Sequence, residues 1–417
     1  MKETFAPYLD VFRSRRVAAV LLFGFSSGLP LALTGGTLQA WLTVAGVKLE
    51  TIAWFSWIGI PYLVKFLWSP VMDRYVPPWL GRRRGWAVVT QGALALGIVG
   101  MAMSPPDDAL LALGAFAVWV AFASASQDIA IDAYRTDVLQ PAERGTGAAV
   151  GVLGYRLAML VSGGLALILA DEIGWRSTYF LMAALMVCSM IVTLVAPDPA
   201  SPAVVPKSLR VAVVEPLREF FCRPGAVALL LLIMLYKFGD ALAGTLTTAF
   251  LIRGVGFTPT DVGVINKGLG LVSLLLGALV GGALLSRMSL YRALMWFGLL
   301  QAVSNLSFMF LAWAGKDYGW LVFAVGFENL ASGMGTAAFV ALAMSLCNAS
   351  FSATQYALLS AIASLGRVLF GPITGTMVNT VGWPTFFFVT FVAALPGLLL
   401  LYRLRGTLPG LQPAVNR

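Results

Sequence analysis

Long apolar stretches recur from one end of this chain to the other, and they constrain its fold more than any other feature. Hydrophobic residues make up 59% of the 417 residues and charged residues 11%, with a mean hydropathy of +0.85. A soluble domain carries about 25% charged residues, and an α-helix needs about 20 apolar residues to cross a bilayer. A soluble fold could not bury this much apolar surface, so we expect an all-α integral membrane protein.

Polar breaks separate the apolar stretches and predict about twelve transmembrane helices. The first stretch follows a basic segment but is too long for the apolar core of a signal peptide, so we interpret it as a retained span. Short loops between neighbours require antiparallel helices. The predicted spans cover residues 17–44, 51–72, 86–104, 110–133, 146–170, 176–196, 226–252, 259–285, 292–314, 319–346, 355–378 and 384–403.

The longest polar break, residues 197–225, divides the spans into two sets of six. We therefore predict an N-terminal six-helix bundle over residues 1–196, a central cytoplasmic loop, and a C-terminal six-helix bundle over residues 226–417. This layout resembles the major facilitator superfamily, whose transporters are built from parallel repeats.

The central loop itself contains a helical pattern. Leu209, Val213, Leu217 and Phe220 recur at helical spacing among charged residues. This pattern predicts an amphipathic helix that lies on the inner membrane surface.

Lysine and arginine residues predict the orientation of the chain. With the N-terminus inside, the segments predicted to be cytoplasmic hold nineteen of the 28 cations and the external loops hold four. Cytoplasmic loops carry the excess of positive charge, so both termini are expected in the cytoplasm. The net charge of +9 has the same explanation, and no nucleic-acid partner is expected.

The composition argues against an enzyme. The chain has no histidine, and Cys188, Cys222 and Cys347 show no spacing typical of a disulfide framework or a metal cluster. Catalysis would need a nucleophile with its base, or a metal, and no predicted loop is large enough for a soluble active site. We expect a transporter with no cofactor and no metal, embedded in the bilayer as a monomer.

Three of the four carboxyl groups within predicted spans lie deep in the bilayer, where they are costly and mark transport pathways. Asp128 lies about 27 Å into its span at 1.5 Å per residue, in the inner part of the bilayer. Asp240 and Glu328 fall near the middle of theirs. Burial favours the protonated form of such a group, whereas a nearby Arg156 would favour the ionised form. Without histidine, proton coupling is expected to use Asp128, Asp240 and Glu328.

Five cations lie within the predicted spans against four acids, which favours an anionic or zwitterionic substrate. Arg156 and Arg367 hold similar depths in spans 5 and 11, which occupy equivalent positions in the two halves. They could face each other across a central cavity and bind carboxylate or phosphate in a bidentate manner. The alternative is that each charge is paired and only fixes helix packing. The expected substrate-binding residues are Gln39, Lys65, Gln127, Arg156, Lys237, Asn266, Lys267, Asn329 and Arg367.

The loop after span 2 reads SPVMDR at residues 69–74 and GRRR at residues 81–84. It resembles the superfamily signature Gly-x-x-x-Asp-Arg-x-x-x-Arg-Arg, with serine in place of the first glycine and a longer gap. On span 4, Asp128, Asp132 and Arg135 are spaced i, i+4 and i+7 and share one helical face. The acid and cations near the inner surface could latch the helices together, or belong to an ordinary basic loop. The expected cytoplasmic latch is Asp73, Arg74, Asp132 and Arg135.

Three motifs together resemble the AmpG-type muropeptide permeases. They are FGFSSGLP at residues 23–30 with QAWL at 39–42, PYLVKFLWSPVMDR at 61–74, and SQD through AYR at 126–135. The likeness is strong in the N-terminal half and extends over the rest of the chain as layout. Some permeases of this family have extra spans that this sequence lacks.

The resemblance implies a proton-coupled importer of the bacterial inner membrane. Its substrates would be N-acetylglucosaminyl-1,6-anhydromuramyl peptides, anionic muropeptides that are recycled into the cell wall and that signal β-lactamase induction in many Gram-negative bacteria. Acetyl-coenzyme A transporters resemble the same group, and a drug exporter of this fold is a further alternative.

Overall fold

The computed structural model describes residues 14–139, 144–198, 218–223, 225–285, 287–346 and 352–406. Every regular element within them is a helix, and nine of these described helices are long and apolar enough to cross a membrane. One of the nine contains a break at Gly382, where φ is 77° and ψ is 167°. This break lies between the last two predicted spans, and the count of twelve spans stays a prediction. The predicted all-α membrane fold is confirmed, and the chain is a multi-pass membrane protein.

Large apolar side chains on the flanks of the helices explain why a bilayer is required. Leu111 is 89% exposed, Val195 79% and Leu96 72%. Such an apolar surface is unfavourable in water but matches hydrocarbon. Between the helices, large apolar side chains such as Phe23 and Phe250 are fully buried, and small residues let some helix pairs approach closely.

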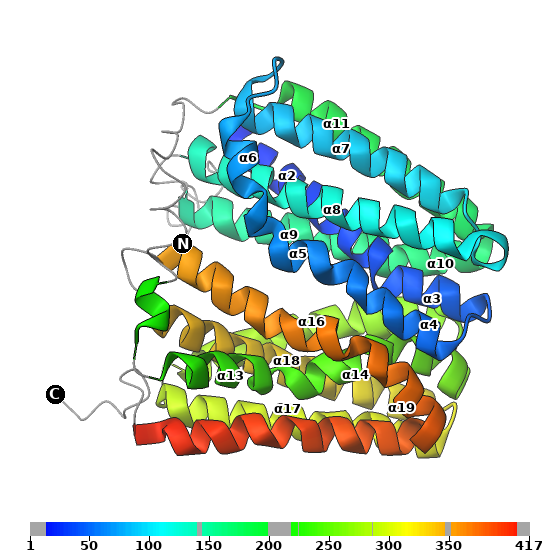
Figure 1. Cartoon of the computed structure of the whole chain (residues 1–417). Coiled ribbons are helices and arrows are strands. Elements are labelled where there is room, and N and C mark those ends of the chain that lie inside the picture. Colours follow the sequence, from blue (N-terminus) through cyan, green and yellow to red (C-terminus); the bar gives the residue numbers. More distant parts are fainter. Residues whose placement is uncertain are drawn as a thin grey trace, which may run out of the picture. The chain divides into compact units, whose positions relative to one another are not determined.

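The chain divides into two compact units by its contacts. The first contains the described residues of Met1–Ala45 and Ile58–Lys207, and the second those of Gly46–Trp57 and Ser208–Arg417. Each unit consists of its own set of helices (Figure 1).

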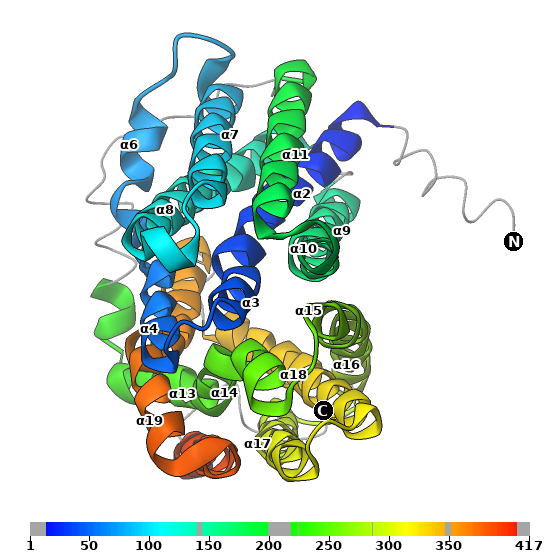
Figure 2. The same cartoon turned by 90° about the vertical axis from the view of Figure 1, so that its right-hand side faces the viewer.

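In the first unit, α7 packs against both α8 and α11, and α2 packs against α9 and α8 (Figure 2). Glycines set the distance between α2 and α9, because a Cβ on Gly24 would lie 2.2 Å from the Gly151 carbonyl oxygen. A Cβ on Gly154 would lie 2.1 Å from the Leu21 oxygen. The helices of this unit are α2 (Arg15–Thr34), α3 (Gly36–Val44), α5 (Ile60–Val64), η2 (Lys65–Leu67), α6 (Ser69–Arg74), α7 (Gly81–Ala102), α8 (Pro106–Val138), α9 (Arg144–Leu160), η4 (Val161–Leu165), α10 (Ala166–Ile173) and α11 (Trp175–Val195).

In the second unit, α18 packs against α16 and α17, and α19 packs against α13, α14 and α17. A Cβ on Gly277 would lie 2.1 Å from the Leu330 oxygen, so glycine again sets a close helix pair. The helices of this unit are α4 (Leu49–Trp54), α13 (Ala226–Tyr236), α14 (Phe238–Ala249), η5 (Phe250–Val255), α15 (Pro259–Asp261), η6 (Val262–Leu269), α16 (Gly270–Leu285), α17 (Leu290–Ala314), α18 (Tyr318–Ser345), α19 (Ser352–Arg403) and η8 (Leu404–Gly406), and η1 (Phe55–Gly59) spans the boundary between the units.

Residues 46–57 pack in the second unit although they precede α7 in the chain. A Cβ on Gly375 of α19 would lie 2.6 Å from the Glu50 Cα atom, so a glycine leaves room for α4. Asn379 donates its amide to Glu50, and the Arg253 guanidinium donates to the Val47 carbonyl at 2.8 Å. These contacts hold α4 against α19.

Several spans are interrupted where polar residues occur. Lys237 separates α13 from α14, Lys65 begins the short 3-10 turn η2, and Lys267 lies in the π-helix η6. Interruptions free backbone groups, which a membrane protein tolerates only inside protein or beside a water-filled cavity. The helix breaks therefore mark the same regions as the intramembrane charges.

Candidate transport site

The polar interior of the first unit is centred on Asp128 of α8. Ser27 of α2 donates its hydroxyl to Asp128 Oδ1 at 2.5 Å. Lys65 Nζ lies 3.8 Å from Asp128 Oδ2, with the two side chains 35% and 19% exposed. Hydrogen bonds to an ionised group are among the stronger ones. The carboxylate of Asp128 is thus compensated by one hydroxyl and one ammonium group.

A cavity of about 270 Å³ adjoins this carboxylate. Sites for drug-sized ligands hold about 300–1,000 Å³, so the cavity suits one ring or one charged group of a larger molecule. The prediction that Asp128, Asp132 and Arg135 share a helical face is confirmed, since all three line it. The polar lining consists of Ser27 from α2, Asp128, Asp132 and Arg135 from α8, and Tyr155 and Arg156 from α9.

Arg156 differs from the other cations around this cavity. Lys65 is ion-paired with Asp128, and Arg135 Nη2 lies 3.1 Å from Asp132 Oδ1. Within the part of the chain that the structure describes, the Arg156 guanidinium has no ion pair and no protein hydrogen bond. It therefore presents free donors to whatever occupies the cavity.

Gln127 is adjacent to Asp128 in sequence but faces a different way. It is fully buried and donates its amide to Ser26 Oγ at 2.6 Å. Gln91 of α7 donates to the same hydroxyl at 2.9 Å, and Thr193 of α11 donates to Gln91 Oε1 at 2.8 Å. This buried network joins α2, α7, α8 and α11. Gln91 is not among the predicted residues, because a single glutamine in a span gives no sign of its partner.

The second unit holds its own charged interior, where α14 begins. Asp240 lies in the first turn of α14, where the helix dipole favours a negative charge. Gln301 of α17 donates its amide to Asp240 Oδ2 and lies 3.5 Å from the Ser332 hydroxyl. Lys237, at the helix break, donates to Thr336 Oγ1 at 3.1 Å. Gln301, which contacts Asp240 from α17, is not among the predicted residues.

Glu328 of α18 belongs to the same interior. Lys237 and Lys267 both lie close enough to it for electrostatic attraction, and Asp240 close enough for repulsion. Two predicted proton carriers and two predicted substrate-binding lysines thus meet in the second unit. Asn329, the next residue, donates to the Val325 carbonyl of its own helix at 2.9 Å.

For most of the remaining predicted residues the structure gives the helix and the exposure. Asn266 is half-buried in η6, Gln39 is half-buried in α3, and Arg367 is exposed on α19. Asp73 and Arg74 lie at the end of α6, but their side chains are outside the described residues. The predicted pairing of the latch acids with these two residues therefore stays a prediction.

Comparisons with known proteins agree in pointing to one family. The model of the Major Facilitator Superfamily matches residues 17–369. The anhydromuropeptide permease of Escherichia coli (strain K12) is 56% identical over 402 residues, which cover 96% of this chain and 82% of that protein. The putative transporter AmpG 4 of Rickettsia conorii is 31% identical over 404 residues, covering 94% and 97%. The chain belongs to the anhydromuropeptide permease family of the major facilitator superfamily. It is a transporter and not an enzyme, as predicted.

Solved structures show the same fold for this permease-family transporter. A bacterial homologue of the human lysosomal transporter Spinster matches with a TM-score of 0.74 at 14% identity, covering 95% of this chain and 98% of that one. A D-xylose–proton symporter matches with a TM-score of 0.71 at 12% identity, covering 97% and 99%. The predicted fold of the superfamily is confirmed.

Within each unit of the transporter, arginine side chains connect helix ends that are predicted to face the cytoplasm. In the first, Arg83 Nε donates to Asp137 Oδ2 at 2.8 Å. Arg84 donates to the Thr193 and Leu194 carbonyls at the end of α11, at 3.2 and 2.5 Å. Arginine side chains therefore satisfy carbonyl groups that a helix end leaves unpaired.

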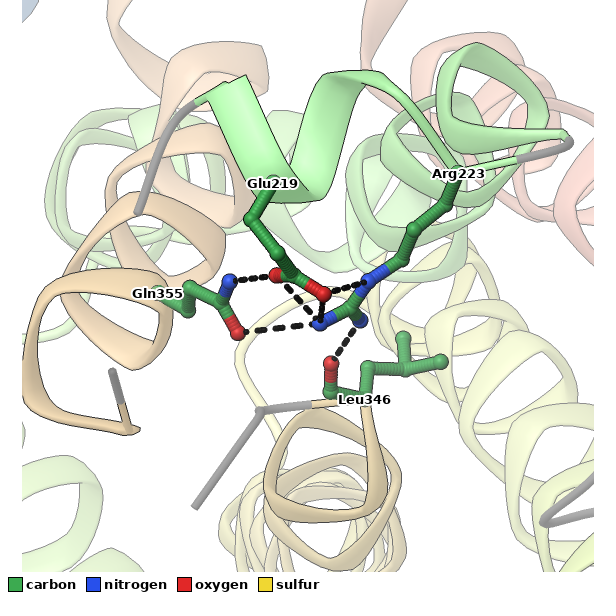
Figure 3. Close-up of polar contacts among 4 residues, drawn as sticks. All are labelled: Glu219, Arg223, Leu346 and Gln355. Atoms are coloured by element: carbon green, nitrogen blue, oxygen red, sulfur yellow. Dashed lines mark hydrogen bonds and ion pairs between the residues drawn. The ribbon is translucent and has the colours of Figure 1, made fainter. Parts of the chain in front are cut away.

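In the second unit of the transporter, Arg223, which precedes α13, also donates to a carbonyl group at a helix end (Figure 3). Its Nη1 donates to the Leu346 carbonyl at 2.5 Å, at the end of α18. Its Nη2 lies 2.7 Å from Glu219 Oε2, and the Gln355 amide of α19 donates to the same carboxylate. Phe220, predicted on the membrane surface, is buried in the core of this unit. Leu209, Val213 and Leu217 lie outside the described residues.

A metal centre finds no support in the described part of the chain. Histidine is absent from the sequence, and no group of three cysteine or carboxylate residues there could hold a metal ion. The side chains of both interiors form ion pairs and hydrogen bonds.

Proposed function

We propose that this transporter imports N-acetylglucosaminyl-1,6-anhydromuramyl peptides into the bacterial cytoplasm together with protons. The observation that carries the substrate is the 56% identity to the E. coli anhydromuropeptide permease along 96% of the chain. The protein would lie in the inner membrane as a monomer with both termini in the cytoplasm. The bundles of residues 1–196 and 226–417 would alternate access to the substrate.

The geometry of the first unit supports an anionic substrate. Arg156 lines the cavity with no protein partner among the described residues, beside an ion-paired Asp128. A muropeptide carries carboxylates, which a guanidinium binds through two parallel hydrogen bonds. Arg367, at the equivalent place in span 11, is proposed as the second anion-binding residue.

The carboxyl groups supply the proposed proton coupling. Asp240 and Glu328 lie within one charged interior with Lys237 and Lys267, and Asp128 lies in the other unit. A carboxyl group beside a cation can change its protonation as the surroundings open and close, which couples protons to substrate movement.

Uptake into inner-membrane vesicles tests the proposal. Vesicles would be prepared from a strain that lacks its own permease and expresses the full-length protein in its membrane. Labelled anhydromuropeptide would then be added with and without an imposed proton gradient. We expect accumulation that requires the gradient and that unlabelled muropeptide competes away. A variant carrying Arg156→Ala and Arg367→Ala, expressed to the same level, is the control. Absence of uptake by well-expressed protein contradicts the substrate, and uptake that ignores the gradient contradicts the coupling.

A further inference from the structure

Two amide side chains on α17 form a buried pair. Gln301 and Asn305 are spaced i and i+4, so they lie on one face of the helix. They are only 3% and 0% exposed. Gln301 donates its Nε2 group to Asp240. The face of α17 that carries this pair is therefore directed at the charged interior of the second unit.

Three atoms of this pair have no hydrogen-bond partner among the described residues. They are Gln301 Oε1 and both polar atoms of Asn305, Oδ1 and Nδ2. Neighbouring hydroxyls donate elsewhere, since Ser304 donates to the Gln301 carbonyl at 2.8 Å and Ser307 to the Ser304 carbonyl at 2.6 Å. Buried polar groups are almost always paired, with protein or with bound water. Amide donors and acceptors on one face are the surroundings that a buried water requires.

Gly335 of α18 gives the Gln301 amide its room. A Cβ at Gly335 would lie 2.5 Å from Gln301 Oε1, a separation that side chains do not show. The amide carries donors on one side and an acceptor on the other. It can therefore donate to an ionised Asp240 and, after a half turn, accept from a protonated one. A neutral partner that serves both states suits a carboxyl group that changes its charge.

We propose that Gln301 and Asn305 bind a water molecule beside Asp240, and that Asp240 gains and loses its proton through this water. The inference rests on the proposed proton coupling. A protonated water delivers one proton to the carboxylate and leaves a neutral carboxyl and a neutral water, while the amides keep their own protons. The charged groups that face Asp240 are Lys237 and Glu328. In the predicted orientation Asn305 lies about 6 Å closer to the outer surface than Gln301, at 1.5 Å per residue.

Reconstituted full-length protein separates coupling from substrate movement. Gradient-driven uptake of labelled anhydromuropeptide would be compared with counterflow, which exchanges substrate without a gradient. For Asn305→Leu, which keeps the number and branching of the side-chain atoms and removes the amide, we expect the ratio of the two rates to fall about tenfold, the scale of one lost hydrogen bond near a charge. Asn305→Ser keeps a polar group and room for water, and should retain most of the ratio.

Gln91→Leu is the matched control. Gln91 is an equally buried glutamine on α7 of the first unit, and its partners are Ser26 and Thr193. It should lower both rates alike. An unchanged ratio in Asn305→Leu overturns the proposal. So does a structure that resolves waters elsewhere in the bundle but none between Gln301 and Asn305. If substrate transport by the wild-type protein does not respond to the proton gradient, the proposed proton-coupled function and the coupling role of Asp240 are both contradicted. The water resolved in a structure tests the binding site independently of transport.

Discussion

The two units surround their buried acids in different ways. Asp128 in the first unit contacts an ammonium group and a hydroxyl group. Asp240 in the second contacts a neutral amide, with Lys237 and Glu328 within electrostatic range. An ion pair favours one charge state of a carboxyl group, whereas an amide accommodates both. We infer a division of roles among the three proposed proton-coupling acids: Asp128 of the first unit mainly organises the cavity, and Asp240 and Glu328 of the second unit carry the proton.

Replacing each acid by its amide gives the largest expected contrast. Asp128→Asn leaves Lys65 without its counter-charge beside the cavity, so uptake and counterflow should both fall by about a hundredfold, or about 2.7 kcal/mol. Asp240→Asn should abolish accumulation driven by the gradient and leave counterflow within about tenfold of the wild type. Rates would be measured in proteoliposomes against the expression level of each variant.

Asp107→Asn, at an exposed acid in the first turn of α8, is the control and should change neither rate. Identical behaviour of the Asp128 and Asp240 variants would remove the division of roles between the units.

Substitution of Arg156 should have the next largest effect, and it tests whether the cavity binds the anionic substrate. Arg156→Ala removes the cation without a protein partner, so the half-saturating concentration of substrate should rise about ten- to hundredfold, the scale of a charge-assisted contact. The response to the proton gradient should persist. Arg156→Lys keeps the charge but not the planar donor pair, and should recover only part of the affinity. Unchanged saturation in both variants would show that the cavity does not bind the anion.

Gly335 tests the second unit through its packing. In Gly335→Ala the new methyl group meets Gln301 Oε1, so the free energy of unfolding in detergent should fall by about 1–3 kcal/mol. Gly282→Ala in α16 is the matched control, since nothing lies within 4 Å of its Cβ. There the substitution should be neutral or stabilise by up to about 1 kcal/mol. Equal stability of the two variants would mean that the Gln301 amide is not confined.

The spans were predictable because hydropathy alone limits where a chain can cross a bilayer. The gap left between residues 378 and 384 contains Gly382, where the helix breaks, and Pro384 follows it. Likewise, helical spacing was enough to place Asp128, Asp132 and Arg135 on one face. These features depend on local sequence only.

Contacts between helices were not predictable in the same way. Gln127 is one residue from Asp128, but adjacent positions on a helix point in different directions, so it bonds to Ser26 instead of lining the cavity. Gln301 contacts Asp240 only because α14 and α17 pack together. Nothing in an apolar span distinguishes a glutamine that reaches an acid from one that does not. Partner choice is set by packing, which a single sequence does not record.

The smallest expected effect concerns the strength of the ion pair on which the comparison depends. Lys65 and Asp128 are 3.8 Å apart and 35% and 19% exposed, whereas Arg83 and Asp137 are 2.8 Å apart and 15% and 16% exposed. Double-mutant cycles on unfolding in detergent, with Lys65→Met and Asp128→Asn in one and Arg83→Met and Asp137→Asn in the other, would measure both. Partly exposed pairs contribute about 0.2–1 kcal/mol, and we expect the Lys65 pair within this range and below the Arg83 pair. A coupling energy of zero for Lys65 and Asp128 would mean that Lys65 does not fix the charge of Asp128. The proposed difference between the two units, an ion-paired acid in one and an amide-bound acid in the other, would then be lost.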